Sequence, residues 1–368
     1  KPYKIKGVNR HQDRPDKGWA ISSADHREDM SLIKEIGANG IRLAHYPHSD
    51  EFYTLCDREG MLVWAEIPLV GKALDTPEFT ENMKTELTEL VRQNFNHPSI
   101  FCWSLSNELS KGDVKGLISE LNDVAHREDP GRLTVLASNV EGRPENTVPD
   151  LLAFNTYPGW YWAEPSEMKP TLERWNRKGG GKGIAVSEYG AGANVWHHWQ
   201  TGKKTPKADG VFHPEEWQAT VHEQTYDAIK RCGFAWGSFV WNMFDFASAS
   251  RNEGDMPGMN DKGLVSYDRK IRKDAFYFYQ SEWSEEPVVH ITSRRDVARR
   301  DSLTDVKVYT NCETVRLKVN GKDCGSPERD GSVCIWRKVG LKHGENQVEA
   351  FGHRGGQEFS DRCKWVLF

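Results

Sequence analysis

The segment SIFCWSLSNELSKGD (99–113) opens as a buried strand and then places an amide and a carboxylate, Asn107 and Glu108, directly after the apolar residues. Short apolar segments bounded by polar residues are typical of strands that are buried on both faces of a parallel sheet. Neither Asn107 nor Glu108 helps to build a core. The segment therefore predicts a strand whose end carries functional side chains.

Seven further segments of the same kind lie on both sides of this one, and polar or amphipathic stretches separate them. The eight predicted strands are 4–9, 40–45, 61–67, 99–106, 133–138, 151–157, 183–188 and 234–242, and predicted helices include 23–38, 49–59, 80–94, 115–127 and 214–231. Alternating strands and helices predict a parallel sheet, and eight repeats favour a closed (β/α)8 barrel, a TIM barrel, over residues 1–283. The link at 141–150 is rich in Pro and Gly and shows no clear helix.

The pattern changes after Trp283. Residues 305–324 alternate between apolar and polar side chains with a period of two, and Asn320-Gly321 is a hairpin signal. We expect residues 284–368 to form a second domain, a small immunoglobulin-like β-sandwich.

Composition excludes several classes of function. The 368 residues are 37% hydrophobic and 28% charged, with a net charge of -5 and scattered basic residues. Nucleic-acid binding normally needs a basic patch, and a membrane span needs about 18 consecutive apolar residues. The sequence therefore predicts neither a nucleic-acid partner nor a membrane.

Cysteines and the first residues say less. The seven cysteines form no CxxC pair and no zinc-like spacing, and the chain begins at Lys1 within a few residues of a predicted strand. We interpret the chain as a fragment of a longer protein, with any export signal removed or further upstream. The compartment, bacterial cytoplasm or periplasm, stays open.

In barrels of this type the site is built at the carboxyl ends of the strands. The polar or aromatic residues at these ends are Asn9, Arg10, His11, Arg42, His45, Glu66, Asn107, Glu108, Asn155, Tyr157, Glu188, Trp241, Asn242 and Asp245. Glu108 and Glu188 end strands on opposite sides of the ring. Retaining glycoside cleavage needs two carboxyl groups about 5–5.5 Å apart, one as acid and one as nucleophile. The alternative is structural: Asn107 caps a helix, Glu108 lies in its first turn, and Glu188 is a solvated loop acid.

Several motifs resemble glycoside hydrolase family 2, and the bacterial β-galactosidases are the most similar members. They are GVNRHQD (7–13), GIRLAHYPHS (40–49), WSLSNELS (103–110), SEYGAG (187–192) and FVWNMFDF (239–246), with the residues up to Trp283. The resemblance implies a retaining exo-β-glycosidase in which Glu108 is the general acid/base and Glu188 the nucleophile. It also implies that the substrate is a terminal β-galactoside.

The resemblance implies supporting roles as well. Asn107 would bond the sugar 2-hydroxyl, Arg42 would hold and orient Glu188, and Tyr157 would donate to Glu188. The alternatives are a helix cap, a surface ion pair and a packed loop aromatic.

Three more residues would contact the sugar. His11 and His45 would bond hydroxyl groups, although such histidines are often structural, and Trp241 would form a stacking floor. Glu66 receives no catalytic part. The magnesium ligands of some β-galactosidases have no match after it, so we expect no essential metal and no cofactor.

One motif complicates the choice of sugar. Asn260 and Lys262 in MNDKG are similar to the Asn-x-Lys pair with which β-glucuronidases clasp a carboxylate, although the surrounding stretch resembles galactosidases. The sequence therefore favours a β-galactosidase, with a β-glucuronidase of the same family as the alternative.

The resemblance also points to what is missing. Family members carry a jelly-roll sugar-binding domain and an immunoglobulin-like domain before the barrel, and a loop of the first helps to complete the galactose pocket. The expected partners are thus a β-galactoside glycan and these two domains of the same chain, and the isolated fragment could be weakly active or inactive. A homo-oligomer is compatible with the sequence but not indicated by it. From another class, a catalytically silent carbohydrate-binding protein stays open, although both glutamates are intact.

Overall fold

A computed structural model of the chain describes residues 4–109, 111–181, 183–199 and 205–368. Eight parallel strands close into a barrel in sequence order, with β8 paired to β1. They are β1 (Ile5–Arg10), β2 (Gly40–Leu43), β3 (Leu62–Glu66), β4 (Ile100–Asn107), β5 (Leu133–Ser138), β6 (Leu151–Asn155), β7 (Ile184–Tyr189) and β8 (Ala235–Val240). The predicted barrel is confirmed.

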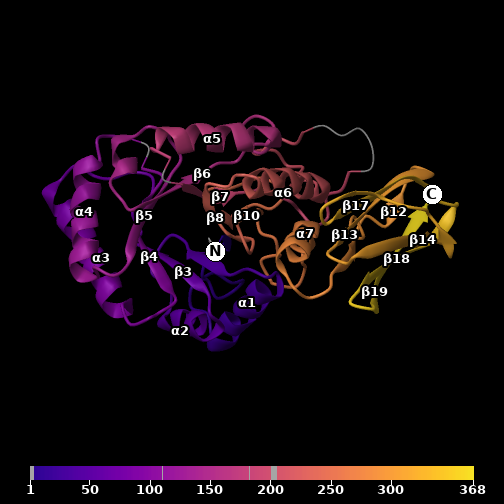
Figure 1. Cartoon of the computed structure of the whole chain (residues 1–368), viewed down its shortest axis with the longest axis horizontal. Helices are drawn as coiled ribbons and strands as arrows, with labels where there is room; N and C mark the ends of the chain where they lie inside the picture. The colour runs from indigo at the N-terminus through magenta and orange to yellow at the C-terminus, as the bar shows by residue number, and fades with distance from the viewer. Residues whose placement is uncertain (1–3, 110, 182, 200–204) are drawn as a thin grey trace.

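Helices surround the barrel (Figure 1). They are α1 (Ser23–Glu35), α2 (Asp50–Glu59), α3 (Pro77–Asn94), α4 (Lys115–Glu128), α5 (Met168–Lys178), α6 (Glu215–Lys230) and α7 (Asp274–Trp283). Ser22 caps α1 through a capping box, whereas α3 begins three residues before the predicted position 80, because Pro77 follows a Thr76 cap. Between β5 and β6 lies only a short 3₁₀ helix (Pro144–Thr147), as the Pro- and Gly-rich link predicts.

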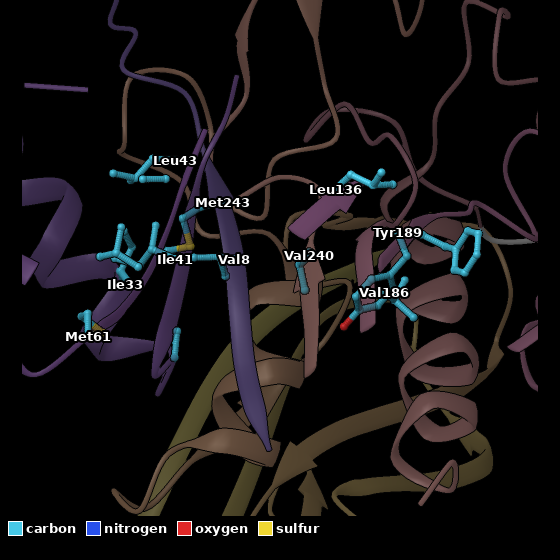
Figure 2. Close-up of a cluster of buried hydrophobic side chains, with 14 of the residues drawn as sticks. Val8, Ile33, Ile41, Leu43, Met61, Leu136, Val186, Tyr189, Val240 and Met243 are labelled. Atoms are coloured by element: carbon cyan, nitrogen blue, oxygen red, sulfur yellow. The ribbon is translucent and has the colours of Figure 1, made fainter. Parts of the chain in front are cut away.

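The strands bury both faces, which explains their continuous apolar character. One face packs against the helices, and Figure 2 shows part of this layer, with Ile33 of α1 and Ile41 of β2 in the same cluster. The other face fills the barrel, where Phe239 occupies the space in front of Gly7: a Cβ there would lie 2.3 Å from its ring. The barrel is therefore a packed core whose polar residues can only gather at its open end.

The C-terminal part is all-β, as predicted. A four-stranded sheet has the order β11-β13-β17-β16 and a five-stranded sheet the order β12-β19-β18-β14-β15. The strands are β11 (Val289–Ile291), β12 (Ala298–Arg299), β13 (Leu303–Thr310), β14 (Thr314–Val319), β15 (Lys322–Asp323), β16 (Glu328–Asp330), β17 (Val333–Gly340), β18 (Gly344–Arg354) and β19 (Gln357–Leu367). Asn320 and Gly321, both with positive φ, form the β14–β15 hairpin turn.

The last helix joins the two parts (Figure 1). α7 ends at Trp283 and packs on β13, where the Phe278 and Tyr309 rings lie 5.6 Å apart. Glu223 of α6 also accepts hydrogen bonds from Tyr309 and from Lys307. The division into domains at 283/284 stays a prediction, because α7 packs both against the barrel helix α6 and against β13 of the C-terminal part.

Candidate active site

The two candidate catalytic glutamates lie where the barrel strands lose their regular register. The β4–β5 pairing shifts between Ser104 and Asn107, just before Glu108, and the β7–β8 pairing shifts between Val186 and Tyr189, around Glu188. Such bulges re-aim side chains at strand ends. Glu108 also has a φ of 53°, a left-handed conformation that costs a non-glycine residue about 1–2 kcal/mol. The local chain therefore gives up regular structure to present these two carboxyl groups.

Glu188 is held by a different donor at each oxygen. Arg42 Nη1 donates to Oε1 at 2.6 Å, and the Tyr157 hydroxyl donates to Oε2 at 2.7 Å. Glu188 as a whole is 5% exposed, so little of it faces solvent. Burial and the neighbouring Glu188 carboxylate raise the pKa of the Tyr157 hydroxyl well above its usual range, so Tyr157 stays a donor. Glu188 is thereby fixed in orientation.

Glu108 has a sparser environment. Among the described residues, one hydrogen bond, from Asn155 Nδ2 to Oε1 at 2.9 Å, holds the carboxyl group. Burial and the charge of Glu188 raise its pKa above the usual value, and the Asn155 bond only partly opposes them. The charge of Glu188 thus acts in the same direction as burial on the pKa of Glu108.

Arg42 connects the residues at this end of the barrel. The alternative role considered for it, a surface ion pair, is wrong because Arg42 is completely buried. Besides Glu188, it donates to Glu66 from Nε at 2.9 Å and from Nη2 at 3.1 Å. Glu66 also bonds His45 Nδ1 at 2.7 Å. Burial raises the pKa of Glu66, but the Arg42 charge and the His45 bond outweigh it and leave the pKa below its usual value. Glu66 thus orients Arg42 and His45, a role that the sequence analysis did not assign.

Asn107 is not a helix cap, because α4 begins at Lys115 after Val114. Its Oδ1 accepts from Arg42 Nη2 at 2.8 Å and from Asn155 Nδ2 at 3.0 Å. In the described part of the chain no residue accepts a hydrogen bond from its side-chain nitrogen. Asn107 therefore faces the site with a free donor beside Glu108.

His11, His45 and Trp241 lie together. The ring of His45 stacks on Trp241 with centroids 5.0 Å apart, and the ring of His11 is 5.4 Å from Trp241. His11 Nδ1 bonds the Tyr46 hydroxyl at 3.2 Å. Burial and nearby positive groups lower the pKa of His11 well below its usual value, so its ring is neutral. The three residues form an aromatic wall with polar edges, which suits a sugar ring.

Lys262 and Asn260 follow β8, and both are buried. Asn260, in β10 (Met259–Asn260), accepts from the Lys262 amide at 3.1 Å. The Lys262 ammonium lies 3.6 Å from Glu253 and over the rings of Tyr161 (5.2 Å) and Trp160 (5.7 Å). Among the described residues it has no hydrogen-bond partner.

Two tyrosine rings connect this cation with Glu188. Tyr161 contacts Tyr157 edge to face at 5.1 Å, and Tyr157 donates to Glu188. Glu253 also bonds Arg251 Nη1 at 2.5 Å, and Arg251 donates to the Tyr161 hydroxyl at 3.2 Å. A buried ammonium whose hydrogen-bonding capacity is unused is costly, even beside a carboxylate at 3.6 Å, so the arrangement is suited to an anionic ligand.

Asn155, Tyr161, Arg251 and Glu253 are site residues that sequence reasoning did not assign. Asn155 ends a strand, so its position was a usable signal, but its bonds to Asn107 and Glu108 join segments almost 50 residues apart.

Among the described residues, no group of three or more His, Cys, Asp or Glu side chains is placed to hold a metal ion. Nor does any described helix have the length and apolarity of a membrane span.

The barrel matches a known protein family. Residues 1–285 match the family model for the TIM barrel domain of glycosyl hydrolases family 2. The chain belongs to glycoside hydrolase family 2. Residues 301–360 match a domain of unknown function. The predicted family is thus confirmed for the barrel, and the match leaves the role of the C-terminal part open.

Individual relatives add information on the sugar. A β-glucuronidase of Bacteroides fragilis is 44% identical over 355 residues, covering 94% of this chain and 51% of the relative. A B. fragilis crystal structure described as a "putative beta-galactosidase" superposes with a TM-score of 0.94 at 35% identity, covering 99% of this chain and 55% of the other. Bacteroides uniformis β-glucuronidase 2, covalently bound to cyclophellitol-6-carboxylate aziridine, gives a TM-score of 0.91 at 30% identity over 100% of this chain and 46% of the other.

The chain spans about half the length of these relatives. The predicted preference for galactosides is not confirmed, because the curated relative at 44% identity is named a β-glucuronidase.

Proposed function

We propose that the protein to which this chain belongs is a retaining exo-β-glucuronidase. It would release terminal glucuronate by two displacements through a covalent glycosyl-enzyme. The observation that carries the proposal is the buried Lys262 ammonium, which has no hydrogen-bond partner in the described part of the chain and is connected to Glu188 through the rings of Tyr161 and Tyr157.

In the first displacement, Glu188 attacks the anomeric carbon while Glu108 donates its proton to the leaving oxygen. Arg42 and Tyr157 hold both oxygens of Glu188, so one carboxylate orientation is presented to the sugar. Glu108 is suited to be the acid because burial and the charge of Glu188 raise its pKa.

The second displacement reverses the role of Glu108. Once Glu188 is esterified by the sugar it no longer carries a negative charge, so one of the two causes of the raised pKa of Glu108 disappears. Glu108 can then accept a proton from the water that attacks the anomeric carbon. The same pair of residues thus supplies an acid in one step and a base in the next.

The remaining residues would bind the sugar. Asn107 would donate from its free amide to the 2-hydroxyl, a bond that strengthens toward the transition state. His11 and His45 would bond hydroxyl groups, and Trp241 would contact the apolar face of the ring. Lys262 would pair with the C6 carboxylate, beside Asn260. The B. uniformis relative supports this assignment, because the compound bound to it is named as a 6-carboxylate.

The test compares three nitrophenyl substrates, the β-glucuronide, the β-glucoside and the β-galactoside, with the natural full-length protein. The glucuronide should be turned over best, and Lys262→Ala should lower its kcat/KM about 10–100-fold, the worth of one charge-assisted hydrogen bond. Lys270→Ala is the matched control, because Lys270 lies on the same segment but is exposed. Lys270→Ala should leave kcat/KM for all three substrates unchanged.

A β-galactosidase is the second candidate, favoured by the description of one structural relative. Faster turnover of the galactoside, with no effect of Lys262→Ala, would support it against the first proposal. Sugar binding without any turnover would instead point to a carbohydrate-binding protein that has lost catalysis.

A further inference from the structure

The residue between Asn260 and Lys262 has an unusual environment. Asp261 is completely buried, and its Oδ2 bonds His213 Nδ1 at 2.6 Å. His213 is equally buried and bonds the carbonyl oxygen of Lys207 through Nε2 at 3.2 Å. A buried His–Asp pair therefore anchors the short segment that carries the candidate carboxylate-binding residues.

The backbone of the same segment is held from two further directions. The carbonyl oxygen of Asp261 accepts from Lys273 Nζ at 2.8 Å and from the Ala193 amide at 3.0 Å. Ala193 lies in the loop that follows the strand of Glu188. The carbonyl oxygen of Lys262 accepts from the amide of Asn242 at 3.0 Å. Residues 261 and 262 thus connect the loop after β7, which follows the candidate nucleophile, with the residues directly after β8.

Two glycines make room for the Asp261 carboxylate. A Cβ at Gly192 would lie 2.3 Å from Oδ1, and a Cβ at Gly254 would lie 2.3 Å from Oδ2 and 2.8 Å from His213 Nδ1. Any side chain at either position would displace the carboxylate. The backbone on both sides is therefore built around this one group.

Stability alone does not explain such a group. Asp261 Oδ1 has no hydrogen-bond partner among the described residues, and a buried carboxylate with an unused oxygen costs folding free energy. Burial raises the pKa of Asp261, but the His213 bond and the charges of His213, Lys273 and Lys262 outweigh it and keep the pKa below its usual value. The Lys262 ammonium is thus one of the positive charges around Asp261, and it has no hydrogen-bonding acceptor of its own among the described residues.

We propose that Asp261 and His213 are positioning residues that fix Lys262 for an acidic sugar and thereby set selectivity for a carboxylate at C6. This inference rests on the proposed function. Neither residue would touch the reacting atoms: both act through Lys262. Displacement of a positioned group by about 1 Å can cost a reaction about 100-fold, so a loosened anchor is enough to remove the selectivity.

The test is the ratio of kcat/KM for nitrophenyl β-glucuronide to that for nitrophenyl β-glucoside, which differs only at C6. In the full-length protein, Asp261→Asn and His213→Ala should lower this ratio about tenfold or more, through a higher KM for the glucuronide. The kcat for the glucoside should change by less than about threefold, because that sugar does not use Lys262. His213→Gln keeps a side-chain donor, so its ratio should lie between that of His213→Ala and that of the wild type. This pair of variants tests the inference even if Asp261→Asn does not fold.

The matched control is Asp274→Asn. Asp274 is also a buried acid bonded to a histidine, at 2.9 Å from His290 Nε2, but it lies at the contact with the C-terminal sheets. It should lower thermal stability and leave the ratio unchanged.

An unchanged ratio in both Asp261→Asn and His213→Ala would overturn the inference, as would an equal loss on both substrates. If the wild-type protein itself does not prefer the glucuronide, the proposed function fails before any variant is compared, and the two failures are thereby distinguished.

Discussion

The open end of the barrel and the contact between the barrel and the C-terminal sheets both bury charged side chains, but they treat them differently. At the contact, Asp274 bonds His290 at one oxygen and the Ser293 amide at the other, and Glu215 accepts from Arg295 at both oxygens. At the open end, the Lys262 ammonium and one Asp261 oxygen have no hydrogen-bond partner in the described part of the chain, and the nearest carboxylate to Lys262 is an ion-pair contact with Glu253 at 3.6 Å.

The difference indicates what each region is for. Buried charges whose hydrogen bonds are all made hold two parts of a chain together. Unused hydrogen-bonding groups and the left-handed backbone of Glu108 instead cost folding free energy, which is explained if they serve the binding or conversion of a ligand. The following substitutions should therefore divide into those that remove activity and those that remove stability.

The largest effect is expected for Glu188→Gln. Loss of the attacking carboxylate should lower kcat/KM about 10⁴-fold or more, which corresponds to about 5.5 kcal/mol of barrier. Arg42 keeps its two bonds to Glu66, so the free energy of unfolding in urea should change by less than about 1 kcal/mol. Retained turnover, or a stability loss as large as the activity loss, would contradict the assignment of Glu188.

Next in size is Arg295→Ala at the contact between the two parts. The substitution leaves the buried Glu215 carboxylate without its cation, which should cost about 3–5 kcal/mol in unfolding free energy. Glu215→Gln should cost less, because the remaining Arg295 side chain is 18% exposed and still lies 3.9 Å from Asp274, whereas Glu215 is completely buried. Both variants should keep the wild-type kcat/KM at temperatures where they are folded, and a selective loss of activity in either would break the distinction between the regions.

Asn155→Ala should have a smaller effect, visible in the pH profile. The Asn155 bond favours the ionised form of Glu108, so its removal should raise the pKa of Glu108 further. Because Glu108 must be protonated to act as the acid, activity is lost as pH rises through its pKa. The basic limb of kcat/KM should therefore move up by about 0.5–1 pH unit.

The graded control is Ser187→Ala, which removes the donor to Asn155 Oδ1 at 2.7 Å but keeps the amide. It should move the limb in the same direction by less. A downward movement in either variant would mean that Asn155 favours the protonated form instead.

Much of this fold could be predicted from the sequence because strand and helix signals are local. The eight strands are short apolar segments between polar residues, and capping residues such as Ser22 and Thr76 mark helix starts. Two helices, α5 and α7, were not predicted. α5 follows Pro165 and contains Pro170 in its first turn, and α7 (DAFYFYQSEW) is apolar over most of its surface because it is buried between two parts of the chain.

The site was harder to predict, for a physical reason. The motifs pointed to Glu108, Glu188, Arg42 and Tyr157, and the structure brings these four side chains to one end of the barrel. The role of Glu66 in orienting Arg42 and His45 could not be predicted, because an acidic residue at a strand end has the same sequence signal whether it faces a substrate or an arginine. That choice depends on contacts across the barrel, which no local pattern contains.

The smallest effect is expected for Arg337→Gln on the surface of the C-terminal sheets. Arg337 bonds Asp305 at 2.8 Å and Glu328 at 2.9 Å, yet all three side chains are about half exposed or more. Exposed ion pairs contribute about 0.2–1 kcal/mol, and the difference from wild type should shrink in 1 M salt. A loss as large as that of Arg295→Ala would mean that the number of ion pairs, rather than their burial, determines stability, and the distinction between the two regions would then lose its physical basis.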